Sequence, residues 1–362
     1  MKRKMLYVSH VDWRWIKQRP HFIAEGLMEH FDVSVLYTFQ NRNRNLLQKR
    51  DISEGDIRPL YNIPMSGRIK PLGIINRISV RSQLMHHIRR VNPEFLYLTY
   101  PNQSGYLPNQ FNGKVIYDCM DDHIAMAPPS TRVTLENCER RILHRADIVL
   151  VSSENLRHVL IQRYGEEYGK KMHLIRNGYN GQILEIEPSV PKHSERFTIS
   201  YIGTIGKWFD FDLIMKSLDE FPDLCYKIIG PVEGQPPQHE RLEFTGTVDH
   251  SKLYDTVKDT DCLSMPFVLN DIVASVDPVK FYEYINYNMN ILSIRYPEIQ
   301  RYEPFVHFYE DYESFAAQIR SMMADNTVRY SQKEREQFLK ANNWSNRVDT
   351  IVDILQEVSF KN

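Results

Sequence analysis

The sequence predicts an α/β protein with two domains, each built on a parallel β-sheet covered by helices. Short apolar runs of the kind that form buried strands alternate with helical or loop segments along all 362 residues. This alternation favours parallel sheets with helices on both faces. The length favours two domains, because single hydrophobic cores stop growing beyond about 250–300 residues.

The first half is expected to form one of these sheets. Its predicted elements are a helix at 19–30 and strands at 4–9, 33–37, 95–99, 114–118 and 147–152. Asn177-Gly178 ends this half, and residues 185–196, with Pro188 and Pro191, are typical of a linker. We therefore expect a first domain at 1–184 and a second at 185–344.

The second half repeats the plan. Its predicted strands lie at 197–203, 226–230, 241–246, 262–266 and 290–294, with helices near 210–219, 251–258, 278–287 and 311–324. In such sheets ligands bind beyond the carboxyl ends of the strands. Candidate functional residues are therefore sought where strands end.

Segment 277–285 (DPVKFYEYI) predicts a phosphate-binding helix start. Pro278 suits the first turn of a helix, where its missing N–H costs nothing. Lys280 and Glu283 are spaced to share one helix face. A helix N-terminus beside a lysine attracts phosphate, and the carboxylate one turn further can accept hydrogen bonds from sugar hydroxyls. The alternative is a helix start with an ordinary ion pair.

Segment 197–210 predicts a second phosphate contact. An alternating strand ends in Gly203-Thr204-Ile205-Gly206-Lys207, and a helix is expected to begin near Asp210. A strand, a glycine-rich turn and a helix in this order present backbone amides to a phosphate. The glycine spacing matches neither the dinucleotide fingerprint nor a Walker loop.

Together these motifs resemble the C-terminal domain of retaining family 4 glycosyltransferases, which have the GT-B fold. The resemblance continues through segments 19–24 (RPHFIA), 115–122 (VIYDCMDD), 146–153 (ADIVLVSS) and 175–178 (IRNG). The mid-chain segments are similar to bacterial surface-polysaccharide enzymes, such as the teichuronic acid glycosyltransferases. The resemblance implies two Rossmann-like domains facing across a cleft, with a C-terminal helix at 345–362 returning to the first domain. It also implies a hexosyltransferase that moves a sugar, with retention, from a nucleotide-sugar to a glycan or lipid-linked glycan in capsule or exopolysaccharide synthesis.

The resemblance assigns donor-binding roles in the second domain. The residues it implies are Gly203, Thr204, Lys207, Asp271, Pro278, Lys280 and Glu283. Lys207 and Lys280 would stabilise the leaving diphosphate without a metal or other cofactor, since two cations and backbone amides can replace the metal. The alternative for both is a solvated surface lysine. Family 4 enzymes often carry a sugar-contacting Glu eight positions before the ribose Glu, where this chain has Ser275. Asp271 and Asp277 are the nearby substitutes.

Two groups in the first domain are candidates for the acceptor side. Asp118, Asp121 and Asp122 follow a predicted strand and could bind acceptor hydroxyls, with Asp122 as the catalytic base. Alternatively, these carboxylates cap the next helix. His10, Trp13 and Trp15 follow the first strand, where GT-B enzymes place an acceptor loop. The tryptophans could stack on a sugar or fill the core.

Charge is unequal between the halves, although the net charge is −1. Residues 1–180 hold 27 Lys and Arg against 17 Asp and Glu. Residues 57–93 contain seven basic residues, no acid and several isoleucines, a pattern that can bind an anionic membrane. The alternative is a surface helix whose apolar stripe packs on the sheet. No motif accompanies the charge to indicate nucleic acid as a partner.

The sequence shows no secretion signal and no membrane-spanning run, which predicts a cytoplasmic protein, peripheral on the inner face of the membrane if residues 57–93 dock there. Four scattered cysteines indicate neither a zinc site nor a disulfide framework. Two other functions stay open. A GT-B sugar-nucleotide epimerase would share the donor site, and Ser275 leaves room for a non-catalytic GT-B protein that binds a nucleotide or a partner.

Overall fold

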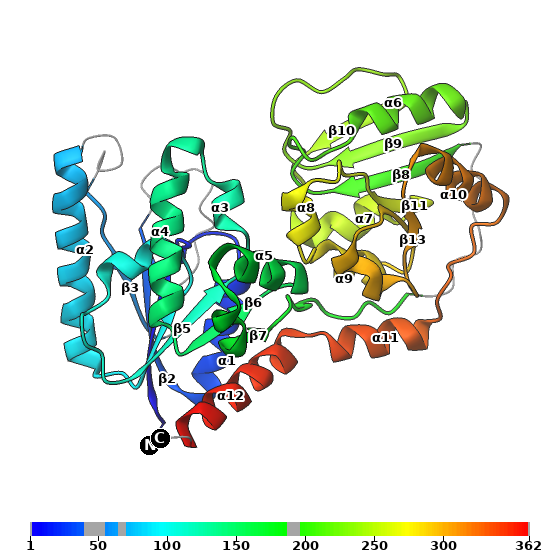
Figure 1. Cartoon of the computed structure of the whole chain (residues 1–362). Helices are drawn as coiled ribbons and strands as arrows, with labels where there is room; N and C mark the ends of the chain where they lie inside the picture. The colour runs from blue at the N-terminus through cyan, green and yellow to red at the C-terminus, as the bar shows by residue number, and fades with distance from the viewer. Residues whose placement is uncertain (1, 40–54, 64–69, 187–195, 361–362) are drawn as a thin grey trace. The chain divides into compact units, whose positions relative to one another are not determined.

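The chain folds into two compact units in a computed structural model that describes residues 2–39, 55–63, 70–186 and 196–360 (Figure 1). Unit 1 comprises Met1–Asn177 and Trp344–Asn362, and unit 2 comprises Gly178–Asn343. Residues 178–184 thus belong to unit 2, although we expected the first domain to end at 184. The backbone explains this, since the amide of Tyr179 donates to the carbonyl of Asn342 and that of Leu184 to the side chain of Asn286.

Unit 1 contains a parallel sheet with seven strands among the residues described, in the order β3-β2-β1-β4-β5-β6-β7. The strands are β1 (Lys4–Ser9), β2 (Asp32–Thr38), β3 (Asp56–Leu60), β4 (Phe95–Leu98), β5 (Lys114–Cys119), β6 (Ile148–Val151) and β7 (Met172–Leu174). The helices are α1 (Arg19–His30), α2 (Lys70–Val91), α3 (His123–Met126), α4 (Pro129–Arg145), α5 (Glu154–Tyr164) and α12 (Trp344–Phe360), with 3-10 turns at Pro101–Tyr106 and Glu166–Lys171.

The two strands that the sequence did not predict, β3 and β7, lie at the edges of this sheet. β3 reads DIRPL and is only partly buried, so it lacks the apolar run that marks the central strands. β7 has three residues. Edge strands bury one side or less, and their sequences therefore carry a weaker hydrophobic signal.

The C-terminal helix α12 belongs to unit 1, which confirms its expected return to the first domain. It packs on α1, where the rings of Phe22 and Trp344 stack with centroids 5.2 Å apart. Gly26 permits the close approach of the two helices, because a Cβ at this position would lie 2.5 Å from the side chain of Val348.

Unit 2 contains a second parallel sheet, with six strands among the residues described, in the order β10-β9-β8-β11-β12-β13. The strands are β8 (Phe197–Ile202), β9 (Leu224–Ile229), β10 (Leu242–Gly246), β11 (Cys262–Met265), β12 (Asn290–Ile294) and β13 (His307–Tyr309). The helices are α6 (Phe211–Glu220), α7 (Leu253–Val257), α8 (Asp271–Ser275), α9 (Lys280–Asn286), α10 (Tyr312–Ala324) and α11 (Gln332–Ala341), with 3-10 turns at His250–Lys252 and Pro297–Tyr302. The sequence did not predict β13, α8 or α11.

Both sheets reverse their strand order at one point, between β1 and β4 in unit 1 and between β8 and β11 in unit 2. Each unit is thus a Rossmann-like sheet, which confirms the predicted α/β class. At such a switch point the connections leave in opposite directions and open a crevice beyond the carboxyl ends of the strands. The two switch points are therefore where ligands are expected.

Candidate functional site

At the switch point of unit 2, glycines follow two neighbouring strands, and Gly203 is partly exposed. Gly203 follows β8 with φ +155°, and its amide donates to the carbonyl of Ile229. Gly230 follows β9 with φ +141°, and a Cβ there would lie 2.0 Å from the carbonyl oxygen of Gly203. Both positions therefore need glycine. The chain can approach a ligand here with its backbone alone.

Lys207 lies in the turn between β8 and α6, as the sequence predicted. The amide of Phe209 closes this turn on the carbonyl of Gly206 at 3.0 Å. Lys207 and Thr204 are exposed, and the ammonium group of Lys207 has no ion pair among the described residues. Asp210 caps α6 by accepting from the amide of Leu213 at 2.9 Å, which confirms the predicted helix start.

The loop after β11 is joined to this turn. The amide of Val268 donates to the carbonyl of Trp208, and the amide of Asp210 donates to the carbonyl of Pro266. The loops on the two sides of the switch point are thus held together through their backbones. The turn that contains Lys207 is therefore fixed by backbone hydrogen bonds to the loop after β11.

Helix α9 presents Lys280 and Glu283 on one face, as predicted, with Nζ of Lys280 2.7 Å from Oε2 of Glu283. The helix begins at Lys280, so the prediction that Pro278 opens it was wrong by two residues. Pro278 is buried just before the helix. The side chains of Lys280 and Glu283 are 28% and 19% exposed, so both reach solvent.

His250 joins this pair, although the sequence analysis did not select it. It lies in the 3-10 turn after β10, and its Nε2 is 3.3 Å from Oε1 of Glu283. This hydrogen bond raises the pKa of His250 above its ordinary value. Burial acts to raise the pKa of Glu283, but bonds to His250 and Lys280 outweigh it and hold that pKa low. The position of His250 shortly after a strand's carboxyl end was the available signal.

Glu283 keeps acceptor capacity for a ligand. Each of its oxygens has one partner among the described residues, Oε1 with His250 and Oε2 with Lys280. A carboxylate oxygen offers two lone pairs, so each can still accept from a sugar hydroxyl. The observed ion pair is therefore compatible with both alternatives that the sequence left open.

Ser275 is buried, and its hydroxyl donates to the carbonyl of Asp271 at 3.1 Å within α8. Of the two possible substitutes for the missing Glu, Asp277 is 4% exposed and pairs with Arg301. Asp271 is exposed. Only Asp271 of the two is accessible to a ligand.

The switch point of unit 1 holds the three aspartates predicted for the acceptor side, in three different states. Asp118 is buried and pairs with Arg19 at 2.8 Å. Arg19 also donates to the carbonyl of Ile175 at 2.7 Å. This pair ties α1 to β5 and to the chain after β7, which is a structural role.

Asp122 fits the helix-capping alternative. One of its oxygens accepts from the amides of Ile124 and Ala125 at the start of α3. Both oxygens also accept from Arg163, at 3.0 and 2.7 Å. Burial would raise the pKa of Asp122, but Arg163 and the two amides lower it. A carboxylate held in this way is a poor base, and the predicted catalytic role stays untested.

Asp121 differs from its neighbours. It is partly buried, and no described residue forms a hydrogen bond with its carboxylate. Burial raises its pKa to about 6, Asp118 and Asp122 add to the rise, and Arg19 opposes it. Asp121 is therefore the carboxylate of the three that is available to a ligand.

The other acceptor-side candidates lie in the loop after β1 and differ in their burial. Trp13 is 3% exposed and packs against the ring of His21 with centroids 4.5 Å apart, so it fills the core. Trp15 is partly exposed. His10 lies directly beyond β1, where its backbone amide and its Nδ1 both contact Oγ1 of Thr99.

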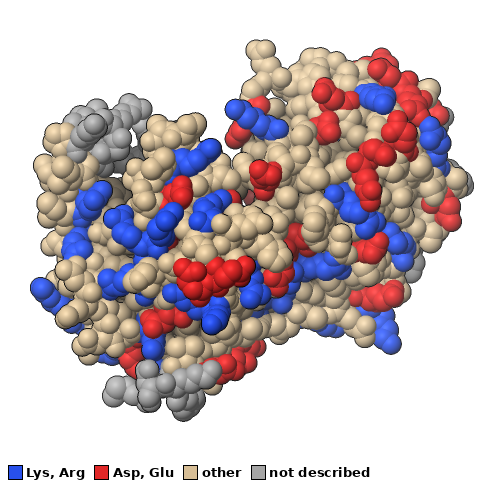
Figure 2. Space-filling view, in the orientation of Figure 1, with Lys and Arg blue, Asp and Glu red and all other residues tan. Residues whose placement is uncertain are grey.

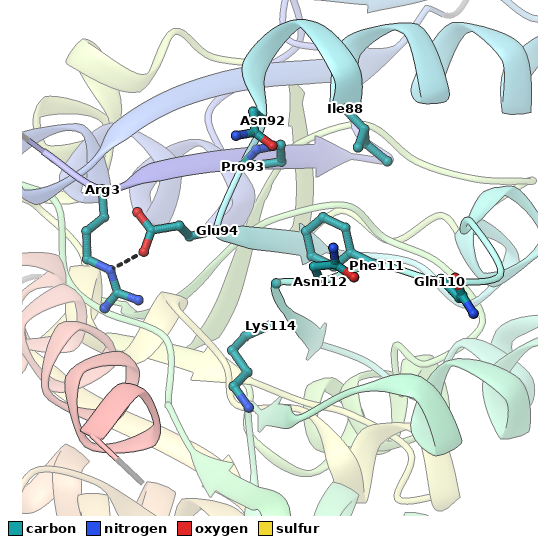
Figure 3. A pocket seen from close by; sticks show the side chains of 10 residues that line it. Arg3, Ile88, Asn92, Pro93, Glu94, Gln110, Phe111, Asn112 and Lys114 are labelled. Atoms are coloured by element: carbon teal, nitrogen blue, oxygen red, sulfur yellow. Dashed lines mark hydrogen bonds and ion pairs between the residues drawn. The ribbon is translucent and has the colours of Figure 1, made fainter. Parts of the chain in front are cut away.

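A cavity of about 590 Å³ opens at the opposite edge of unit 1 (Figure 3). It lies where β1, β4 and β5 begin, and Arg3, Glu94, Phe111 and Lys114 are among its lining residues. Arg3 pairs with Glu94 at 2.9 Å, and Lys114 lies 3.5 Å from Asp147. The cavity lies at the amino ends of the strands, so it is separate from the switch point.

No metal-binding cluster of three or more His, Cys, Asp or Glu side chains occurs in the part of the chain that the structure describes. Among the same residues, no helix is both long enough and apolar enough to cross a membrane. Metal-free turnover stays a prediction.

The solved structures similar to this chain include glycosyltransferases, matched over nearly their full length. Sucrose-phosphate synthase from Thermosynechococcus elongatus covers 100% of both chains at 15% identity and a TM-score of 0.71. Anabaena HepE in complex with UDP covers 98% of this chain and 100% of its own, at 10% identity and a TM-score of 0.72. The lipopolysaccharide outer core galactosyltransferase WaaB covers 96% and 99%, at 10% identity and a TM-score of 0.70. The chain has the GT-B fold.

These identities are low, so the likeness establishes the fold alone. No protein-family model matches the chain, and no curated protein matches it by sequence. The resemblance to family 4 and to the teichuronic acid enzymes therefore stays an expectation.

Proposed function

We propose that this GT-B protein is a glycosyltransferase that moves a sugar from a nucleotide-sugar to a glycan or lipid-linked glycan in bacterial surface-polysaccharide synthesis. The observation that carries the proposal is the switch point of unit 2. There the unpaired Lys207 and the glycine-ended strand β8 lie on one sheet edge, and α9 presents Lys280 and Glu283 to solvent. A nucleoside diphosphate needs cations, free amides and a carboxylate for its ribose.

In the proposed reaction, the bond between the anomeric carbon and the diphosphate oxygen breaks, and the acceptor oxygen bonds to that carbon. The acceptor's proton leaves to the departing phosphate or to solvent. Lys207, Lys280 and the backbone amides stabilise the charge that develops on the diphosphate. Glu283 binds the ribose, and Asp271, the accessible carboxylate of α8, faces the transferred sugar. Retention of the anomeric configuration follows the resemblance to family 4.

The ligands of similar structures support a nucleotide-sugar donor. HepE has been solved with UDP, with UDP and glucose, and with UDP-glucose. The catalytic domain of starch synthase IV from Arabidopsis thaliana, with a TM-score of 0.63, has been solved with ADP and acarbose. UDP-sugars and ADP-sugars are therefore both included in the test.

The experiment is a thermal-shift screen of the full chain against UDP-, ADP-, GDP- and dTDP-sugars. A ligand at 100 times its Kd stabilises the folded state by about 2.7 kcal/mol. Turnover of the selected donor is then followed with and without EDTA. Slow hydrolysis that persists in EDTA supports the proposal. Loss of hydrolysis in EDTA and its return with magnesium or manganese contradicts the metal-free mechanism. Interconversion of two nucleotide-sugars indicates an epimerase. Binding of the nucleotide-sugar without turnover indicates the non-catalytic alternative.

We further propose that α2 docks unit 1 on an anionic membrane. Ile74, Ile75 and Ile78 are 63%, 53% and 64% exposed, so this half of the helix does not pack its apolar stripe on the sheet. Arg77 lies among them and is also exposed. Figure 2 shows basic side chains over the face of unit 1 that carries α2 and α4, whereas acidic side chains are frequent around α6 in unit 2. Apolar side chains interspersed with cations favour an anionic lipid surface.

Some of the basic residues at 57–93 already have partners within unit 1, which reduces the number available to a membrane. Arg58 and Arg90 both pair with Asp56, which lies just outside residues 57–93. Arg81 donates to the carbonyl of Leu107. Arg68 lies outside the described residues, and the side chain of Lys70 is not described. Arg77 and Arg89 remain as the exposed arginines of α2 without a described ion pair.

A further inference from the structure

Three aromatic side chains meet at the switch point of unit 1, one from each of three neighbouring strand ends. His10 follows β1, Tyr100 follows β4, and His123 begins α3 after β5. The ring centroids of His10 and Tyr100 are 5.0 Å apart, those of Tyr100 and His123 4.7 Å, and those of His10 and His123 5.7 Å. We call these residues the imidazole–tyrosine cluster.

The imidazole–tyrosine cluster carries no positive charge near neutral pH. Burial, together with the neighbouring His123 and His21, lowers the pKa of His10 to about 3. Burial also lowers the pKa of His123 to about 4, against the opposing effect of Asp122 and Asp118. Both imidazoles are therefore neutral at pH 7.

Two arginines near this edge, Arg19 and Arg163, are already committed to carboxylates. Arg19 pairs with Asp118, and Arg163 pairs with Asp122 and lies 3.5 Å from Glu139. A phosphate would have to compete with a buried carboxylate for either guanidinium. Neither of these two guanidinium groups is therefore open to an anion in the way that the ammonium group of Lys207 is in unit 2.

Two polar groups beside the rings lack partners. His123 is 8% exposed, and its buried Nε2 has no hydrogen-bond partner. A buried polar atom left without a partner destabilises the folded state, so its persistence indicates that a ligand or water completes it. Two residues earlier, the carboxylate of Asp121 has no described hydrogen bond either. Ring faces beside such groups suit a sugar, which has an apolar C–H face and a rim of hydroxyls.

We propose that the imidazole–tyrosine cluster and Asp121 bind an uncharged sugar ring of the acceptor, with Asp121 accepting a hydrogen bond from one of its hydroxyls. The inference rests on the proposed glycosyltransferase function and names its acceptor class. The moiety at this edge is a neutral sugar, and a phosphate or carboxylate group is disfavoured.

The first test compares matched neutral and charged ligands of the full-length protein by saturation-transfer NMR. The neutral probes are p-nitrophenyl glucoside, galactoside and N-acetylglucosaminide, and the charged probes are p-nitrophenyl glucuronide and glucose 6-phosphate. We expect at least one neutral probe to bind and the charged probes to bind at least fivefold more weakly. Equal or tighter binding of the charged probes, or no binding of any neutral probe, overturns the proposal.

Variants locate the binding. Asp121→Asn and His123→Phe should each weaken the neutral probe at least fivefold and leave nucleotide affinity unchanged, whereas the surface control Asp255→Asn should change neither. Binding to the unmodified protein should strengthen as pH rises through about 6, with Asp118, Asp122 and Arg19 as the charged groups that face Asp121. Asp121→Asn should abolish this pH profile. If the pH profile of binding is unaltered in Asp121→Asn, Asp121 has only a structural role, and the proposed hydrogen bond from the sugar hydroxyl to Asp121 is overturned.

The outcomes separate this inference from the proposed function. Nucleotide binding without any neutral-sugar binding defeats the acceptor inference and leaves the glycosyltransferase proposal standing. If the protein binds neither a nucleotide nor a neutral sugar, the acceptor inference and the glycosyltransferase proposal are both wrong. Since the neutral-against-charged comparison needs no variant, the test holds even where a variant fails to fold.

Discussion

The two sheets have the same kind of strand order, yet their switch points carry opposite chemistry. In unit 2 adjacent strands are followed by Gly203 and Gly230, and the exposed Lys207, which has no ion pair among the described residues, lies in the turn after Gly203. In unit 1 the corresponding strand ends carry side chains: Ser9 ends β1, His10 follows it, and Thr99 follows β4. One edge is cationic and open, and the other is neutral and aromatic.

The difference suggests that one scaffold serves two kinds of ligand. Lysines that reach solvent match a diphosphate, whose charge is localised and large. Neutral rings and an unpaired carboxyl match a sugar, which has no charge to neutralise. The predictions below test this contrast, beginning with the largest expected effect.

The largest effect should come from the buried pair of unit 1. Asp118→Asn leaves Arg19 buried without its carboxylate, which we expect to destabilise the protein by about 3–5 kcal/mol in urea unfolding. The control Asp255→Asn breaks a surface pair with Lys258 and should cost under about 1 kcal/mol. Unchanged stability with lost turnover would instead make Asp118 the acceptor ligand that the sequence suggested.

The glycine edge of unit 2 should be nearly as sensitive. Gly230→Ala forces a Cβ to within 2.0 Å of the carbonyl oxygen of Gly203 at a positive φ, so we expect a loss of about 2–4 kcal/mol. Gly234 also has a positive φ, +88°, but nothing lies within 4 Å of a Cβ there. Gly234→Ala should therefore cost only about 1 kcal/mol. Equal losses in the two variants would mean that the packing of the strand ends does not matter.

Asp121 should make stability depend on pH. Its pKa is raised to about 6 in the folded protein, so the folded state resists ionisation, and the free energy of unfolding should fall as pH rises from about 4 to about 6. Asp121→Asn removes this penalty. We expect the variant to be about 1–3 kcal/mol more stable at pH 7.5 and nearly unchanged at pH 4. No difference at pH 7.5 would show that Asp121 is ordinarily solvated.

Membrane docking through α2 should give smaller changes. Arg77→Gln should weaken flotation with anionic vesicles about fivefold, since each cation near the surface contributes about 1 kcal/mol. Arg89→Gln is the matched control, because Arg89 lies about 18 Å further along the helix, away from the exposed isoleucines. Binding should fall as salt rises. Equal effects of the two variants, or equal binding to neutral vesicles, would contradict docking by this half of α2.

Sequence reasoning predicted much of the fold because the central strands are strongly apolar. The limits of β1, α1 and β12 were predicted to the residue. Several of the elements that it missed are short or lie at sheet edges, such as β3, β13 and α8, where the periodic signal is weak, whereas α11 was missed although it has ten residues.

The donor-side candidates could be predicted because their signals are local. A strand–glycine–lysine unit and an i,i+3 pair are visible in single segments. The states of the three aspartates could not be read in this way. Asp118 and Asp122 are committed by Arg19 and Arg163, which lie 99 and 41 residues away in the sequence. His250 was missed for the same reason, since its partner Glu283 is 33 residues away.

The most direct test of the two-edge account is calorimetric titration with the nucleoside diphosphate that the donor screen selects. Lys280→Ala should bind it about 10- to 100-fold more weakly, because a charge-assisted hydrogen bond to phosphate is lost. Lys258→Ala removes a lysine with a similar i,i+3 pair, at the surface beyond α7, and should bind like the unmodified protein. Asp121→Asn, at the other edge, should also bind normally. Equal affinity in Lys280→Ala and Lys258→Ala, or a loss confined to Asp121→Asn, would contradict a donor site at the edge of unit 2.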